Sequence, residues 1–160
     1  MGKLGEDCIE ILGISRIFPL HSKSFKQVQI RDTLILPKEK PDIESIFRVT
    51  TSVNIIDKYI ILTPRATSNG FKSLTGKKVV VEGEVVQKIE YGAREVKKSI
   101  CTAQLMKIFS SYIVLDETFD IDCNLEIIPY VEDVCVNKLD KRRVFNNIML
   151  LLDAKSFSSI

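Results

Sequence analysis

Hydrophobic and polar residues alternate along most of this chain. In the clearest stretch, from Lys77 to Tyr91, one face carries Val79, Val81, Gly83, Val85, Gln87, Ile89 and Tyr91, and most positions between them are Lys or Glu. The same period of two runs from Gln27 to Leu36 and from Phe47 to Ile55. Because successive side chains of a β-strand point to opposite faces, this period predicts strands with one buried face.

Polar segments separate the predicted strands. Asp57-Lys58 is predicted as a hairpin turn because the alternation resumes at Tyr59, and residues 64–78, rich in Thr, Ser, Asn and Gly, are predicted as a long connection. Further strands are expected over residues 97–109, 112–115, 125–138 and 143–152, the last two joined by the polar residues 139–142. A mainly β chain of about seven or eight strands is expected to form a β-sandwich or an open barrel.

One segment departs from the period of two. Pro41 suits the first position of a helix, and Ile43, Ile46 and Phe47 recur at the spacing of one helical face. Asp42 and Glu44 would lie near the N-terminus of such a helix, where negative charge is favoured. We therefore expect one short helix near residues 41–47, with its apolar face packed on the sheet.

Composition describes an ordinary globular domain. The 160 residues are 45% hydrophobic and 28% charged, and 23 basic against 21 acidic residues leave a formal net charge of only +2. This balance predicts neither a nucleic-acid partner nor an anionic membrane partner. No apolar run is long enough for a membrane span, and the first residues lack the apolar core of a signal peptide, so synthesis in the cytoplasm is expected.

The sequence offers no constellation for catalysis. The single histidine, His21, lies in a weakly patterned segment and is expected to be a solvated surface side chain. Glycine-rich phosphate loops are missing, and Asp120-x-Asp122-x-Asn124 lacks the glycine and the distant glutamate of a calcium loop. The basic residues Lys138, Lys141, Arg142 and Arg143 are expected to form a charged hairpin tip. We expect no enzyme activity, no cofactor and no metal site.

The four cysteines are widely separated. Cys8, Cys101, Cys123 and Cys135 contain no CxxC pair, which argues against a zinc or thioredoxin-like site. They are expected either to stay free thiols in the cytoplasm or to cross-link subunits after the protein reaches an oxidising environment.

The N-terminal segment, residues 1–24, alternates poorly after Ile17. Its stretch from residue 8 to residue 14 is apolar, and Cys8, Ile9, Ile11 and Ile14 are candidates for contact with a neighbouring subunit through strand pairing. The alternative is that this segment folds back on its own domain. Residues 154–160 are expected to form a C-terminal tail.

Several segments taken together resemble the SPOCS domain, a family associated with spore-coat and sporulation proteins of spore-forming bacteria. The resemblance covers about residues 25–153, as one domain. It is carried by residues 27–37 (QVQIRDTLILP), 40–46 (KPDIESI), 79–85 (VVVEGEV) with 89–91 (IEY), and 130–134 (YVEDV) followed by 141–143 (KRR).

The resemblance implies a β-rich module without catalysis, found in proteins that build or anchor the layers of the spore envelope. It implies a non-enzymatic structural protein of the coat or exosporium that contacts other envelope proteins and copies of itself. Such a protein would be made in the mother-cell cytoplasm and would end in the spore surface layers. The sequence contains no LysM segment like that of some members, which argues against anchoring to the cell wall and favours protein–protein contact. The alternative expectation is a cell-wall or carbohydrate-binding module that acts as an adaptor.

Overall fold

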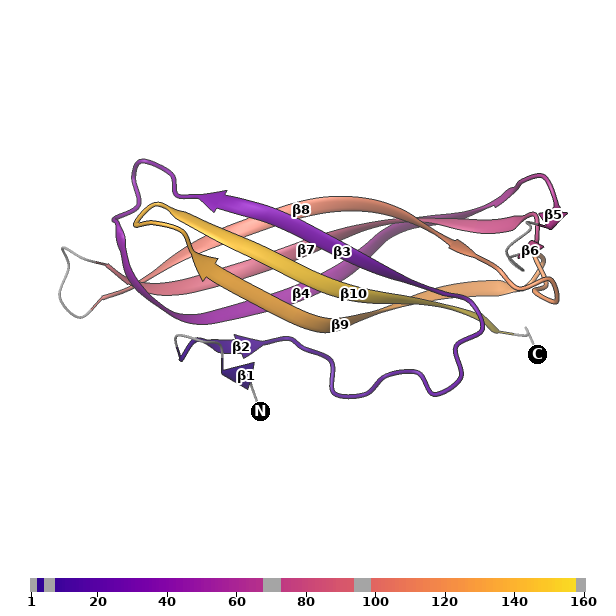
Figure 1. The fold of residues 1–160 in the computed structure, drawn as a ribbon, viewed down its shortest axis with the longest axis horizontal. Helices are drawn as coiled ribbons and strands as arrows, with labels where there is room; N and C mark the ends of the chain where they lie inside the picture. Colours follow the sequence, from indigo (N-terminus) through magenta and orange to yellow (C-terminus); the bar gives the residue numbers. More distant parts are fainter. Residues whose placement is uncertain (1–2, 5–7, 68–72, 94–98, 158–160) are drawn as a thin grey trace.

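The computed structural model describes residues 3–4, 8–67, 73–93 and 99–157. In these residues all regular structure is strand, and two sheets face each other as an elongated sandwich that is not closed into a barrel (Figure 1). This confirms the predicted mainly β fold and selects the sandwich over the open barrel. The strands are β1 (Lys3–Leu4), β2 (Glu10–Leu12), β3 (Phe25–Ile35), β4 (Ile43–Leu62), β5 (Ala66–Thr67), β6 (Ser73–Leu74), β7 (Lys77–Ala93), β8 (Ile100–Val114), β9 (Asn124–Lys138) and β10 (Arg143–Phe157).

The larger sheet has the order β1-β2-β4-β7-β8, and the smaller sheet has the order β3-β10-β9. Nearly all neighbours are antiparallel; β2 runs parallel to β4. The small hairpin β5–β6 lies within the predicted connection 64–78. The core lies between the two sheets, and β7 and β10 each contribute one buried face to it.

The period of two in β7 is confirmed residue by residue. Every second position from Val79 to Ala93 is buried, and the positions between them are more exposed. On β10 the same holds from Val144 to Leu152, and the fully buried side chains Ile148, Leu150 and Leu152 come from this strand. One buried polar residue, Gln87, donates a hydrogen bond to Thr51 Oγ1 (3.1 Å) inside the core.

The short helix expected near residues 41–47 is wrong. Strand β4 begins at Ile43, and its ladder with β7 shifts register between Ile43 and Ser45 and again between Ile46 and Arg48. Each irregularity adds one residue to β4. The next buried residue after Ile43 is therefore Ile46, three positions along the strand instead of two. Bulges therefore produced the helix-like spacing, and Phe47 remains about half exposed.

The hairpin turn predicted at Asp57-Lys58 is also wrong. Strand β4 continues through it for 20 residues, paired with β7 from Ile43↔Ala93 to Leu62↔Lys77. A third register shift, between Ile55 and Asp57, absorbs the break in alternation. Similarly, the strands predicted at 97–109 and 112–115 are one strand, β8, in the described part of the chain.

The predicted hairpin of residues 125–138 and 143–152 is confirmed as β9 and β10. Strand β10 is longer than expected, because residues 154–157 of the predicted tail continue its ladder with β9 to Phe157↔Asn124. Residues 158–160 lie outside the described residues.

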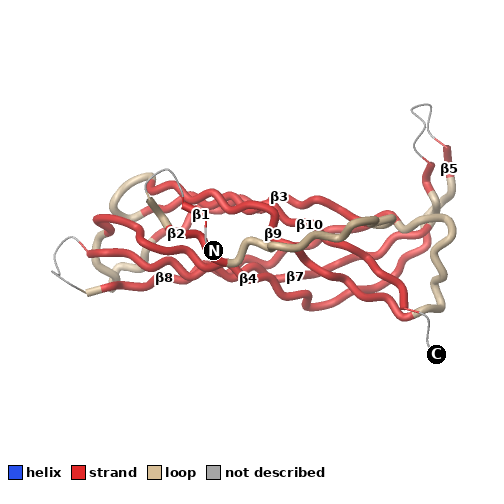
Figure 2. The backbone as a smooth tube through the Cα atoms, turned by 90° about the horizontal axis from the view of Figure 1, so that it is seen from below, coloured by secondary structure: helices blue, strands red, loops and turns tan. Residues whose placement is uncertain are grey.

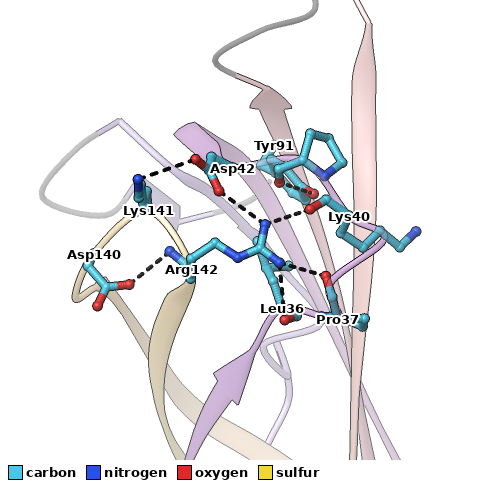
Figure 3. Close-up of polar contacts among 9 residues, drawn as sticks. Leu36, Pro37, Lys40, Asp42, Tyr91, Asp140, Lys141 and Arg142 are labelled. Carbon is cyan, nitrogen blue, oxygen red and sulfur yellow. Dashed lines mark hydrogen bonds and ion pairs between the residues drawn. The ribbon is translucent and has the colours of Figure 1, made fainter.

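The tip of this hairpin holds the loop that leads from β3 into β4 (Figure 3). The Arg142 guanidinium donates hydrogen bonds to the carbonyl oxygens of Leu36, Pro37 and Lys40 and to the carboxylate of Asp42. Next to it, the Tyr91 hydroxyl donates to the carbonyl oxygen of Pro41 (3.0 Å). The four basic residues were expected to form a charged hairpin tip, and one of them, Arg142, fixes the backbone of the neighbouring loop through these hydrogen bonds.

Candidate interaction surface

The N-terminal segment covers one long side of the sandwich, formed by the edges of β4 and β9; we call this the covered side. Strand β2 pairs with β4 over Glu10↔Arg48 to Leu12↔Thr50. Farther along, Ser15 N donates to Val131 O and Val131 N donates to Ser15 Oγ, both at 2.9 Å. Figure 2 shows the loop after β2 running along β9 toward the far end of the sandwich.

An ion pair accompanies this docking. Arg48 Nε lies 2.8 Å from Glu10 Oε2, and the hydrogen bond and charge of Glu10 raise the pKa of the Arg48 guanidinium. At Gly13 the backbone has φ +102°, and a Cβ atom there would lie 2.0 Å from Thr51 O. The segment can therefore approach β4 this closely only because residue 13 is glycine.

The residues predicted to contact another subunit lie mostly against their own domain. Ile9 and Ile11 are 4% and 3% exposed in the core, Ile14 packs partly buried against it, and Cys8 is exposed. The folded-back alternative thus describes this chain. Ile9 and Ile11 are not surface residues that a second copy could contact.

The structure does not bring the predicted cross-linking cysteines together. All four are free thiols; Cys8 and Cys135 are exposed, whereas Cys101 and Cys123 are half-buried. Cys123 Sγ donates to Asp120 O, which leaves Cys8 and Cys135 as the more accessible thiols for a bond between subunits. Cross-linking stays a prediction.

The opposite long side, formed by the edges of β8 and β3, we call the open side. Among the described residues β8 has a strand partner, β7, on one flank only. It is 15 residues long and contains no proline. A long edge strand with free N–H and C=O groups is a template for pairing with another chain.

The outward face of β8 is apolar over much of its length. Its exposed large side chains are Ile100, Met106, Ile108, Tyr112 and Val114. The adjoining outward face of β7 is instead rich in Lys and Glu. The apolar row therefore follows the edge of the sheet.

The order of residues on this face has an approximate two-fold symmetry about Lys107. Moving outward from Lys107 in one direction, the face presents Met106, Gln104, Thr102 and Ile100. In the other direction it presents Ile108, Ser110, Tyr112 and Val114. Both halves therefore begin and end with an apolar side chain.

Strand β8 itself carries one charged side chain, Lys107. Lys107 Nζ donates to Arg31 O (3.0 Å) and lies 3.4 Å from Asp32 Oδ2, which links β8 to β3. The ammonium groups of Lys26 and Lys78 each lie 4.9 Å from the centre of the Tyr112 ring. These contacts hold the side chains along the β8 edge without pairing its backbone.

The sequence contained the apolar positions of β8 but no sign that this strand is an edge. The predicted break after residue 109 divided the row into two parts, and strand order depends on pairings distant in sequence.

The described residues hold no cluster of three or more side chains suited to a metal ion. Asp120 Oδ1 accepts a hydrogen bond from Asp122 N (2.9 Å), as in a tight turn.

No protein-family model, curated protein or solved structure matches this chain. Among the described residues, no helix has the length and apolar character needed to span a bilayer.

Proposed function

We propose that this protein is a non-enzymatic structural protein that associates with a second copy of itself through the edge of β8. The observation that carries the proposal is the two-fold pattern of apolar side chains on an edge strand with one partner. A closed dimer needs a surface that is complementary to itself when rotated by 180°. The β8 edge supports such a contact, because its row of outward side chains is approximately symmetric about Lys107.

The proposed contact is an antiparallel pair of β8 strands centred on Lys107. Each residue then lies opposite the one equally far from Lys107 in the second copy, so Met106 faces Ile108 and Ile100 faces Val114. Opposed residues share a face of the sheet, which puts the outward rows side by side and joins the two larger sheets into one. Cross-strand pairs of this kind each contribute about 0.2–1 kcal/mol, in addition to the backbone hydrogen bonds.

Such a contact closes after two copies. A longer assembly needs a second contact, for which the exposed thiols of Cys8 and Cys135 are candidates. The resemblance to the SPOCS domain supplies the proposed setting: synthesis in the mother-cell cytoplasm, then incorporation into the coat or exosporium with other envelope proteins.

Sedimentation velocity over a concentration series tests the dimer. We expect the unmodified chain to dimerise in the presence of reductant and Ile108→Lys to remain monomeric with an unchanged circular dichroism spectrum. Leu62→Lys is the matched control, because Leu62 on β4 is 70% exposed and Ile108 is 69% exposed. A chain that stays monomeric at the highest concentrations, or an Ile108→Lys variant that still dimerises, would contradict the proposal.

The register is tested by disulfide trapping in a chain whose four native cysteines are replaced by serine. Gln104→Cys combined with Ser110→Cys puts two thiols opposite each other across the proposed axis, and we expect a covalent dimer. Gln104→Cys combined with Val114→Cys puts them out of register and should cross-link much less. Equal cross-linking of both pairs would rule out this register.

A further inference from the structure

A cavity of about 440 Å³ lies at the end of the sandwich where the chain enters β3 and leaves β10. Three segments line this end cavity: residues 19–24 before β3, residues 116, 118 and 119 after β8, and residues 153–157 of β10. In Figure 1 this is the end of the molecule marked by the C-terminus. Its size is within the range of sites that hold small ligands.

Two of its lining residues carry buried polar atoms with no hydrogen-bond partner among the described residues: Asp153 Oδ2 and Ser22 Oγ. The Asp153 side chain is only 1% exposed, and Lys155 Nζ, 3.8 Å away, is too far for a hydrogen bond. Lys155 therefore offsets part of the Asp153 charge as an ion pair, but the buried oxygen still has no hydrogen bond, and buried polar atoms normally have one. The end cavity therefore has an unmet demand for hydrogen-bond donors.

The burial of Asp153 is a local exception on β10. From Val144 to Leu152 the buried residues are the even-numbered ones, which places residue 153 on the outward face. The segment before β3 folds over this position, with Ala154 N donating to Ser24 O (2.9 Å) and Asp116 N donating to Ser24 Oγ (3.1 Å). The fold thus encloses a carboxylate that the strand pattern alone would leave in water.

The lining selects the class of ligand. The positive charges of Lys23 and Lys155 balance the negative charges of Asp116 and Asp153, so the cavity favours neither a cation nor an anion. The remaining groups are the hydroxyls of Ser22, Ser24, Thr118 and Ser156, the His21 imidazole, and the rings of Phe119 and Phe157. Carboxylates that accept hydrogen bonds, ammonium groups that donate them and an apolar ring surface together match a neutral polyhydroxyl compound.

We infer that the end cavity is a binding site for a neutral saccharide of one or two rings. Asp153 accepts hydrogen bonds from sugar hydroxyls, Ser22 pairs with another, Lys155 donates to a ring or hydroxyl oxygen, and Phe157 covers the apolar face of the sugar. This site uses residues outside the β8 strand, and the inference does not depend on dimerisation.

Two-dimensional ¹H–¹⁵N NMR of the full chain tests the inference. The chain is titrated separately with glucose, N-acetylglucosamine and trehalose, and in parallel with putrescine as a cation and citrate as an anion. We expect at least one saccharide to shift the backbone amides of residues 20–24 and 153–157. We expect the two charged probes to leave them unchanged at equal concentration.

Two variants test whether binding depends on the buried atoms that lack a hydrogen bond. Ser22→Ala and Asp153→Asn should each weaken saccharide binding about tenfold or more, since one hydrogen bond to a buried group is lost or weakened. Ser52→Ala and Asp57→Asn, at exposed positions on β4, are the matched controls and should bind normally. Ser22→Ala keeps the test decisive if Asp153→Asn fails to fold.

Three results would overturn the inference. One is the absence of any shift at these amides with all three saccharides. Another is a response to putrescine or citrate in place of a saccharide, which would assign the cavity to a charged ligand. The third is unchanged saccharide affinity in Ser22→Ala and in a folded Asp153→Asn variant.

Discussion

The edges of the two sheets are joined differently on the covered side and on the open side of this sandwich. On the covered side, β2 adds a short parallel strand to β4, and Ser15 exchanges two hydrogen bonds with Val131 of β9. On the open side, contact between the sheets includes Lys107, which reaches from β8 to Arg31 and Asp32 of β3. One side is closed by backbone and core side chains, the other by a side-chain bridge.

This difference shows where an interaction is available. Ile9 and Ile11 of the N-terminal segment are buried against the edge of β4 on the covered side, although Ile17 and Leu20 farther along the segment are exposed. On the open side, the apolar residues along the outward face of β8 remain exposed. An unpaired strand edge is normally protected by charge, proline or a covering segment. Since β8 has Lys107 and little else of that kind, the asymmetry favours a partner on the open side.

The largest predicted effect is on the free energy of unfolding, and it differs between the covered side and the open side. Ile11→Asp places an unpaired charge in the core of the covered side and should lower the free energy of unfolding by about 3 kcal/mol or more. Ile108→Asp on the open side should change it by less than about 1 kcal/mol, measured on the monomer at low concentration. Urea denaturation compares them. Equal losses would remove the distinction between the two sides.

A smaller effect concerns the chain just before β4, which lies at the tip of the β9–β10 hairpin. Burial raises the pKa of the Tyr91 hydroxyl, with the nearby charges of Cys101 and Asp42 acting in the same direction and Arg142 against them. The folded state therefore holds this proton more tightly than the unfolded state, so the stability that it contributes is present below pH 10 and declines as the pH rises above it.

Tyr91→Phe removes both this proton and the hydrogen bond to Pro41 O. We expect a loss of about 1 kcal/mol at pH 7 and a smaller decline in stability between pH 9 and 11 than in the unmodified chain. Urea denaturation at each pH measures both. The same decline in the two proteins would mean that Tyr91 does not carry it.

The smallest effect is on the open side. Lys107→Met removes a partly exposed ion pair and should change stability by less than about 1 kcal/mol. In the proposed dimer the two Lys107 residues lie opposite each other, and like charges so placed oppose pairing by a similar amount. We therefore expect a dimer that dissociates a few-fold less readily, measured by sedimentation over a dilution series. A weaker dimer would argue against an axis at Lys107.

The strands with unbroken alternation could be predicted from the sequence, and those with bulges could not. In β7 each buried position follows the last by two residues, which is a local property. In β4 three register shifts break the period, so the pattern near Ile43 resembled a helix and the one near Asp57 resembled a turn. A bulge is stabilised by the partner strand, which the local sequence does not contain.

The two candidate sites depended even more on distant contacts. The side chains of β8 alternated visibly, yet its position at an edge follows from the order of all strands in the sheet. Asp153 and Ser22 are 131 residues apart in a chain of 160 residues. The sequence around either residue does not predict that the two line one cavity. His21 also belongs to this lining, and it is exposed, as the sequence indicated.

By itself, the sequence determined that this chain forms half-buried strands in a mainly β domain, because the alternation of side chains is set by backbone geometry within each strand. Tertiary structure alone decided which strand became the free edge, where the N-terminal segment docked and why Asp153 is buried. Those outcomes depend on pairing and covering between segments far apart in the chain, whose free energy is gained only when the whole sandwich has assembled.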